Sequence, residues 1–442
     1  MSEITQSETN KFREAFLANP TQRVGQRSVW KNGINNSAQN QSTFVENTPT
    51  FSIDLNTGKV ANQKKSGRCW MFAALNTMRH KLSSDFNLAN FELSQNYTFF
   101  WDKYEKANYF YENILATADL DRTSREVAFL LQTPQQDGGQ WDMMVSIFDK
   151  YGIVPKSAMP ETASSSDSTQ LNEYLNKLLR KHAYILRTLV ADHATASEIE
   201  TKRQDLLQEV YNVLAMALGI PPETFDFEYR DENNNFLQET DLTPQSFFKK
   251  YIDIDFNDYI SVINAPTADK PFMHTYSVDM LGNVVNGKPV QYLNLEMADL
   301  KDLALKQLQA GESVWFGSDV GQSSIRDKGI MALDAYDVNE LFDVDFDTTK
   351  AQRLDYGESM MTHAMVLTGV DLVNDQPTKW KVENSWGDKV GTNGFFVMSD
   401  AWMDEFTYQI VVRKDLLTDA QKAALETEPI KLAPWDPMGA LA

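Results

Sequence analysis

The chain contains the stretch Asn62-Gln63-Lys64-Lys65-Ser66-Gly67-Arg68-Cys69-Trp70, and an apolar pattern with a helical period follows it. From Met71 to Leu82, apolar residues recur at spacings of three and four, which predicts a helix with one buried face. Ser66 and Gly67 stand just ahead of this pattern, where a helix favours a short polar cap and a flexible turn. Cys69 is therefore predicted at or near a helix N-terminus, where unpaired N–H groups and the helix dipole favour a thiolate.

Cys69 is the only cysteine among 442 residues, and on that fact alone an inert, buried side chain is its more common role. Two distant segments favour a reactive role instead. Thr362–Val370 is a β-branched apolar run with His363 near its head, and Trp380–Gly387 is a predicted strand that ends at Asn384. With Cys69 they supply a nucleophile, a base and a residue able to orient the base. Gln63, six residues before Cys69, adds an amide donor for the attacked carbonyl.

These segments, in this order, resemble the papain-type cysteine peptidases, and most closely the branch of bleomycin hydrolase and aminopeptidase C. Further segments carry the likeness to that branch: Phe91-Glu92-Leu93-Ser94-Gln95, Phe100-Trp101-Asp102-Lys103, Asp137-Gly138-Gly139-Gln140-Trp141 and the terminal residues from Pro434 to Ala442. The matches run from about residue 45 to the last residue. The resemblance implies an α+β, papain-like two-lobed fold with a large helical and hook-like insertion.

The resemblance also implies roles for individual residues. Cys69 would attack a peptide carbonyl, and His363 would protonate the leaving amine and then activate water. Asn384 would orient the imidazole, and the Gln63 amide with the Cys69 N–H would form the oxyanion hole. Substrate-binding roles are implied for Gly138, Gly139, Trp386 and Ala442. A plain turn remains the alternative for the two glycines. No metal and no cofactor is expected.

The chain terminus is implied to lie in the active-site cleft. There the carboxylate of Ala442 would pair with a substrate's α-ammonium, and the bulk of the tail would block longer N-terminal extensions. This predicts a cysteine aminopeptidase that acts on peptides with free N-termini. The alternative for the tail is a frayed terminus without a function. Three other functions stay open: an endopeptidase of the same family, a thiol-dependent amide hydrolase or acyltransferase, and a non-enzymatic scaffold.

The predicted organisation has five parts. They are an N-terminal arm (1–45), a helical lobe with the nucleophile (46–155), a mainly helical insertion (156–300), a β-rich lobe with the histidine and asparagine (301–433) and the tail (434–442). The insertion is inferred because Cys69 and His363 lie 294 positions apart, whereas papain-like enzymes separate these residues by about 130–150. It resembles the additions that assemble this family into a homohexamer.

Charge and composition exclude several other functions. The chain has 41 basic and 62 acidic residues, a net charge of −21, which argues against binding to nucleic acid or anionic membranes. No apolar run approaches the roughly 18–20 residues of a membrane span. A polar N-terminus and a single cysteine predict a cytoplasmic location. Asp343, Asp345 and Asp347 begin like a calcium loop, but the required glycine and glutamate do not follow.

Overall fold

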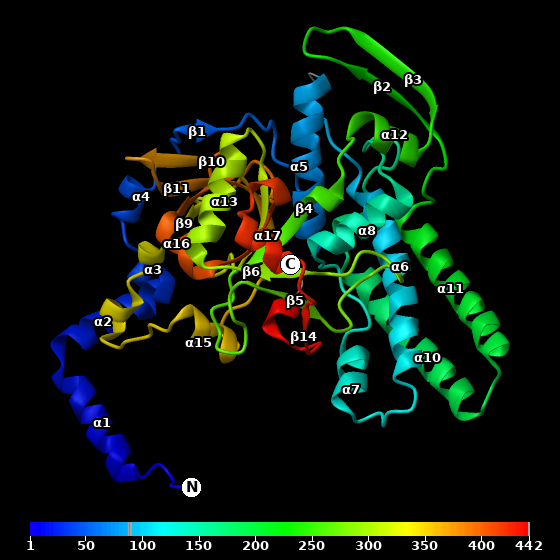
Figure 1. Cartoon of the computed structure of the whole chain (residues 1–442). Helices are drawn as coiled ribbons and strands as arrows, with labels where there is room; N and C mark the ends of the chain where they lie inside the picture. The colour runs from blue at the N-terminus through cyan, green and yellow to red at the C-terminus, as the bar shows by residue number, and fades with distance from the viewer. Residues whose placement is uncertain (87, 89–90, 441–442) are drawn as a thin grey trace.

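The computed structural model describes residues 1–86, 88 and 91–440, which form an α+β fold with two lobes. The fold has two large hydrophobic cores, and the one among the helices also includes residues of the sheet, such as Trp315. One core joins the helices and includes Phe100 and Phe148, and the other lies in the sheet and includes Trp380 and Val382. Figure 1 shows the two parts side by side, with most of the long helices on one side and the sheet on the other. The predicted α+β class is confirmed.

The helical lobe includes α5 (Cys69–Phe86), α6 (Gln95–Ala116), α7 (Arg125–Gln132) and α8 (Trp141–Tyr151). Helix α5 begins at Cys69, and the predicted apolar face from Met71 to Leu82 is buried. The predicted capping role of Ser66 is wrong, because its hydroxyl donates to the Gln63 carbonyl at 2.7 Å. The N–H of Gly67 is bound instead by the distant carboxylate of Asp137, at 2.9 Å.

In the part of the chain that the structure describes, one sheet of 12 strands forms the second lobe. The strands are β1 (Ile53–Asp54), β4 (Tyr259–Ile263), β5 (His274–Val278), β6 (Tyr292–Asn294), β7 (Val314–Ser318), β8 (Ser324–Ile325), β9 (Ile330–Met331), β10 (His363–Val373), β11 (Gln376–Glu383), β12 (Phe395–Ser399), β13 (Thr407–Arg413) and β14 (Ile430–Leu432). Their order is β14-β5-β6-β4-β13-β7-β10-β11-β12-β9-β8, and β1 pairs with β10. His363 opens β10 opposite Ser318, and Asn384 directly follows β11.

The insertion is shorter than the predicted range of 156–300. It includes α9 (Ala163–Ser166), α10 (Thr169–Ala191), α11 (Ala196–Leu218), the hairpin of β2 (Phe225–Arg230) and β3 (Phe236–Leu242), and α12 (Pro244–Tyr251). Strands β4, β5 and β6 also lie in that range, but they belong to the main sheet. Strand β4 pairs with β13. Its side chains Ile260 and Val262 lie in the core of the sheet, and Ile263 lies in the core that includes the helices. The segment outside the two-lobed body therefore ends before β4.

The N-terminal arm contains four helices among its described residues: α1 (Gln6–Ala18), α2 (Pro20–Asn32), α3 (Ile34–Ala38) and α4 (Thr43–Glu46). Thr5 and Glu8 form a capping box on α1, and Asn19 caps α2, so local signals suffice to start both helices. Neither α1 nor α2 buries a side chain, and Figure 1 shows α1 projecting from the body. Helix α1 therefore adds no side chain to a hydrophobic core of the body.

Short helices cover the sheet lobe: α13 (Met297–Gln309), α14 (Val338–Phe342), α15 (Lys350–Asp355), α16 (Asp400–Phe406) and α17 (Asp419–Leu425). Among the described residues, none of the helices combines the length and apolar character that crossing a membrane requires.

Candidate active site

Cys69 and His363 line one pocket of about 330 Å³ between the helical lobe and the sheet. The first residue of α5 supplies the thiol, and the first residue of β10 supplies the imidazole. Both side chains are buried, with 3% and 5% of their surface exposed. The pocket wall is completed by Gln63, Gly67, Gln136, Asp137, Gly138, Asn172 and Thr362. The fold therefore brings together two residues that are 294 positions apart in the chain.

The imidazole of His363 is held by Asn384. The two side chains meet through Nε2 of the histidine and Oδ1 of the asparagine, at 2.9 Å. The same Oδ1 accepts the backbone N–H of Ser385 at 2.7 Å, which fixes the amide with its oxygen toward the histidine. An amide oxygen only accepts, so Nε2 carries the proton. Nδ1 is then the nitrogen that can take up a proton from elsewhere.

Burial opposes charge on both side chains. It raises the pKa of the Cys69 thiol to about 11, while hydrogen bonds from backbone N–H groups, first that of Ala364, act in the other direction. Burial also lowers the pKa of His363 to about 4, while the hydrogen bond that the imidazole donates to Asn384 acts in the other direction. Each group considered alone is therefore neutral at neutral pH. A single proton passing from the sulfur to the imidazole creates both charges together, and each then compensates the other.

Gln63 is fixed by pairing between its own segment and the one that follows Asn384. Its N–H donates to the Ser385 carbonyl at 2.8 Å, and its Oε1 accepts from the Ser385 hydroxyl. Its Nε2 donates one hydrogen to the Ser66 carbonyl at 2.7 Å. Because an amide nitrogen carries two hydrogens, the second stays available in the pocket that Gln63 lines.

Trp386 covers one face of the His363 ring. The two ring centroids are 4.9 Å apart with planes at 29°, and the Arg326 guanidinium lies 3.9 Å from the Trp386 ring centre. This stack lies against the ring whose other contact is the hydrogen bond with Asn384. Trp386 is not part of the wall around Cys69, so its contact with substrate stays a prediction.

The two predicted glycines have different surroundings. Gly138 lines the pocket with Cys69, and its carbonyl accepts a hydrogen bond from the buried Lys106 ammonium at 2.7 Å. Gly139 does not line the pocket. A Cβ on Gly139 would lie 2.5 Å from the Trp70 ring, so the missing side chain there serves close packing. The role of Gly139 in substrate binding therefore has no support from its position.

The Asp137 carboxylate connects the segment before Cys69 with α10 and the residue before it. Its carboxylate accepts hydrogen bonds from the Gly67 N–H at 2.9 Å, from Asn172 at 2.8 Å and from the Ser168 hydroxyl, and Lys103 lies 2.8 Å away. Burial alone would raise its pKa, but the charge and hydrogen bond of Lys103 hold the pKa well below its usual value. Asp137 is thus a buried anion with every lone pair in use, and it fixes the backbone just before Cys69.

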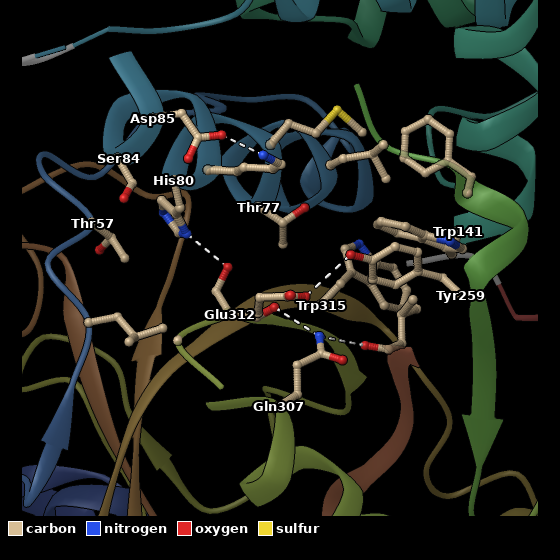
Figure 2. A pocket seen from close by; sticks show the side chains of 18 of the residues that line it. Thr57, Thr77, His80, Ser84, Asp85, Trp141, Tyr259, Gln307, Glu312 and Trp315 are labelled. Atoms are coloured by element: carbon tan, nitrogen blue, oxygen red, sulfur yellow. Dashed lines mark hydrogen bonds and ion pairs between the residues drawn. The ribbon is translucent and has the colours of Figure 1, made fainter. Parts of the chain in front are cut away.

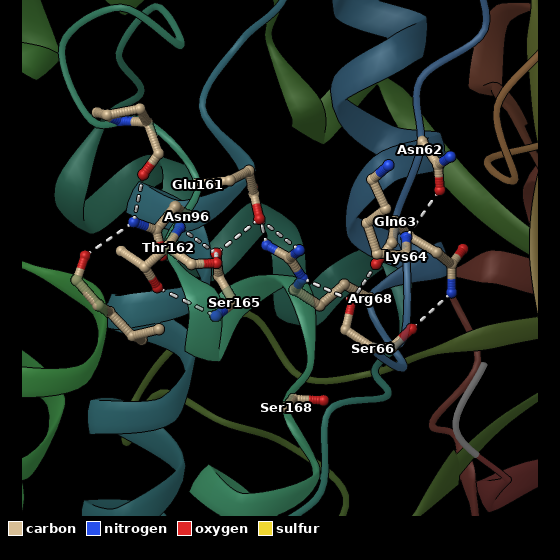
Figure 3. A network of polar contacts seen from close by, with 12 residues as sticks. Asn62, Gln63, Lys64, Ser66, Arg68, Asn96, Glu161, Thr162, Ser165 and Ser168 are labelled. Atoms are coloured by element: carbon tan, nitrogen blue, oxygen red, sulfur yellow. Dashed lines mark hydrogen bonds and ion pairs between the residues drawn. The ribbon is translucent and has the colours of Figure 1, made fainter.

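Arg68, next to the thiol, is anchored in the helical lobe (Figure 3). The guanidinium is fully buried and makes two parallel hydrogen bonds to Glu161, at 3.1 and 2.7 Å. Its Nε donates to the Ser66 hydroxyl at 2.9 Å, and that hydroxyl donates to the Gln63 carbonyl. One continuous network therefore sets the positions of Gln63 and Cys69.

The chain end is held in place by charged and aromatic contacts. Lys270, only 5% exposed, pairs with Asp436 at 2.9 Å. Arg125 lies over the Trp435 ring, 3.9 Å from its centre. These contacts fix the course of the segment that precedes the last residues.

The tail then approaches the candidate site. The Met438 carbonyl accepts from the Tyr292 hydroxyl at 3.1 Å, and the Ala440 carbonyl accepts from Gln140 at 2.6 Å. Gln140 follows the two glycines in the chain. The predicted role of Ala442 concerns a residue outside the described part of the chain.

Two buried carboxylates beside the predicted site residues carry no local sequence signal. Asp137 precedes Gly138, and Glu383 precedes Asn384. Glu383 binds Arg79 at 2.6 Å and His80 at 2.9 Å. Their position next to residues of a motif is the one hint that the sequence offers, because their partners lie far away in the chain.

Comparison with known proteins gives a consistent result. The model of the peptidase C1-like family matches residues 3–439. The chain is 58% identical to aminopeptidase C of Streptococcus thermophilus and covers 100% of both sequences. It is 55% identical to aminopeptidase C of Lactococcus lactis subsp. lactis, over 99% of this chain and 100% of the relative. Among solved structures, PepW from Lactobacillus rhamnosis HN001 superimposes with a TM-score of 0.99 at 60% identity, with 100% of both chains covered.

Proposed function

The chain belongs to the peptidase C1-like family, and from this premise we propose that it is a cysteine-type aminopeptidase that releases N-terminal residues from peptides through a thioester intermediate. Relatives named aminopeptidase C match it over its full length at 51–58% identity. The resemblance inferred from the motifs and the family found by comparison agree.

One observation carries the proposal: the thiol of Cys69 and the imidazole of His363 line the same pocket, and Asn384 holds the far nitrogen of the imidazole. The sulfur passes its proton to Nδ1 of His363 and attacks the carbonyl carbon of the first peptide bond. His363 then gives that proton to the departing amine, which leaves a thioester on Cys69. Water attacks the thioester while Nδ1 accepts its proton, and the proton returns to the sulfur as the acid leaves.

The oxyanion is stabilised by the second hydrogen of the Gln63 amide and by the N–H of Cys69 at the start of α5. A donor of this kind contributes about 3–4 kcal/mol to transition-state stabilisation in comparable sites. The network of Arg68, Glu161 and Ser66 supports this assignment, because it fixes the segment that carries both donors.

Substitution of the nucleophile tests the mechanism. Cys69→Ala should abolish hydrolysis of aminoacyl amides and leave thermal unfolding unchanged, and His363→Ala should remove most of the rate. Retained peptidase activity in a folded Cys69→Ala protein would contradict the assignment. Activity of the unmodified chain on N-blocked peptides would favour an endopeptidase instead.

We attribute the preference for free N-termini to the tail. The hydrogen bond from Gln140 to Ala440 supports this, because it brings the last described residues next to the pocket segment at Gly138. The terminal carboxylate would pair with the substrate's α-ammonium. Deleting residues 439–442 should create activity on N-blocked peptides. If the truncated chain gains none, the tail does not select the substrate's end.

Assembly into a homohexamer and a cytoplasmic location complete the proposal. Exposed apolar side chains on the arm and the hairpin, such as Trp30 and Phe236, support assembly, since such surfaces favour burial against another chain. The single free cysteine fits a reducing compartment. Analytical ultracentrifugation should give a particle mass of six chains. We expect no binding to nucleic acid or membranes, given the net charge of −21.

A further inference from the structure

A second cavity, of about 500 Å³, lies behind the catalytic helix and shares no wall residue with the pocket of Cys69. Figure 2 shows it between α5 and the opposite wall around Gln307 and Glu312. Thr77 and His80 face it from α5, and Trp141 and Tyr259 close one end. It is large enough for a molecule the size of an amino acid.

The cavity has an aromatic side. The Trp141 ring lies 6.3 Å from that of Trp315, 6.2 Å from that of Tyr259 and 6.0 Å from that of Phe256, measured between centroids. Met78 completes this surface. Because Trp141 is 4% and Trp315 1% exposed, a flat apolar group would meet these rings through edge contacts.

The cavity also has polar groups with unused capacity. The Glu312 carboxylate accepts from Arg413 at 2.6 Å and from the Tyr259 hydroxyl at 3.3 Å, which leaves lone pairs free. Lys81, paired with Asp85, keeps two of its three N–H donors.

We propose that this cavity is a second binding site, for a free zwitterionic amino acid with an aromatic side chain. The ring would lie against Trp141 and Trp315, the ammonium would meet Glu312, and the carboxylate would accept from Lys81. A neutral apolar ligand would leave the charged groups unused, and a simple cation or anion would leave the aromatic side unused. The zwitterion uses both.

The walls of the cavity connect it to the candidate active site. His80 binds Glu383, which directly precedes Asn384. The Trp315 indole donates to the Trp70 carbonyl at 3.1 Å, next to Cys69. An occupant therefore contacts groups that position both the nucleophile and the histidine. If the chain releases amino acids as proposed above, a released amino acid that binds here could change the activity of the site. Binding of the amino acid to the cavity does not depend on that proposed function.

Calorimetric titration of the full-length chain with L-phenylalanine tests the site. Saturable binding is expected. N-acetyl-L-phenylalanine lacks the ammonium and should bind at least about tenfold more weakly, which corresponds to about 1.4 kcal/mol. Glu312→Gln should weaken binding of L-phenylalanine and leave the N-acetyl compound unaffected. No binding to the unmodified chain would overturn the proposal.

A filling variant locates the site. Thr77→Met places a longer side chain into the cavity and should weaken L-phenylalanine binding at least about tenfold. Thr201→Met is the matched control, because Thr201 is also a helical threonine bonded to a backbone carbonyl of its own helix but lies on the surface of α11. If Thr77→Met binds as well as the control, the ligand lies elsewhere and the proposal fails. These titrations measure binding and require no turnover of substrate. A failure of the proposed peptidase activity would therefore appear only in the hydrolysis assays and can be told apart from a failure of this proposal.

Discussion

Replacing Glu161 by glutamine should test how the network beside Cys69 is held. Arg68 is fully buried, and its guanidinium lies between the rings of Phe72 and Phe99, 5.1 and 5.0 Å from their centres. Glu161 supplies its only close carboxylate among the described residues. Glutamine keeps the shape but removes the charge and turns an NH₂ group toward an N–H of Arg68.

The expected loss in the free energy of unfolding is large, because Glu161→Gln leaves the Arg68 guanidinium buried without its carboxylate. Removing one partner of a buried ion pair costs about 3–5 kcal/mol, and the partial exposure of Glu161 (21%) places the estimate near the lower value. Glu200→Gln is the matched control. Glu200 makes the same two-bond contact to Arg203, at 2.8 Å, but is 47% exposed and should contribute at most about 1 kcal/mol.

Urea unfolding at neutral pH, followed by tryptophan fluorescence, measures both losses. Activity on an aminoacyl amide should fall for Glu161→Gln and not for Glu200→Gln, because only the first network reaches Gln63 and Cys69. Equal shifts of the unfolding midpoint in the two variants would refute the argument from burial.

The pH dependence follows from the same pair. Burial raises the pKa of Glu161, but the hydrogen bonds and charge of Arg68 outweigh it and leave the pKa below its usual value of 4.5. A carboxyl group with a lowered pKa stabilises the fold above the unfolded-state pKa and loses that contribution as pH falls. The stability difference between the unmodified chain and Glu161→Gln should therefore narrow below about pH 4.5. If the stability difference does not change with pH, the side chain of Glu161 stabilises the fold through packing and not through its charge.

Two further changes have defined outcomes. Gly139→Ala should destabilise the fold by about 1–3 kcal/mol and lower kcat, because its Cβ would overlap the Trp70 ring beside Cys69; unchanged unfolding would contradict the close packing. Lys270→Met should release Asp436 and loosen the tail, which should raise KM for free peptides with little change in kcat and permit cleavage of N-blocked peptides. If Lys270→Met keeps strict selectivity, contacts at Met438 and Ala440 suffice to hold the tail.

The sequence predicts the local parts of this molecule well. The start of α5 at Cys69 follows from a clear apolar period. Strand β10, which begins at His363, and strand β11, which ends just before Asn384, follow from their extended apolar patterns. The order of the motifs predicts that Cys69 and His363 lie at one site, and the two residues do line one pocket, although no local pattern encodes this. The catalytic roles of these residues stay predictions until the variants are measured.

Other features could not be predicted because they depend on side chains far apart in the chain. Strand β6 has three residues, too few to show a period, and it is a strand only because β4 and β5 pair with it. The ammonium of Lys106 reaches the Gly138 carbonyl across 32 positions. No sequence window of ordinary length contains both partners of such a contact.

Asp137 shows why a site cannot be judged from its charges alone. A carboxylate near a thiol raises the thiol's pKa, and Asp137 does act on Cys69 in that direction. The cost is limited, since Lys103 lies 2.8 Å from the carboxylate and three hydrogen-bond donors share its oxygens. In return, the same carboxylate fixes the N–H of Gly67, and the Asp137 carbonyl accepts from the Trp70 indole at 2.8 Å. Asp137 therefore disfavours the Cys69 thiolate slightly, but it also holds the backbone on both sides of Cys69 in a fixed position. An oxyanion hole requires backbone donors that are fixed in this way.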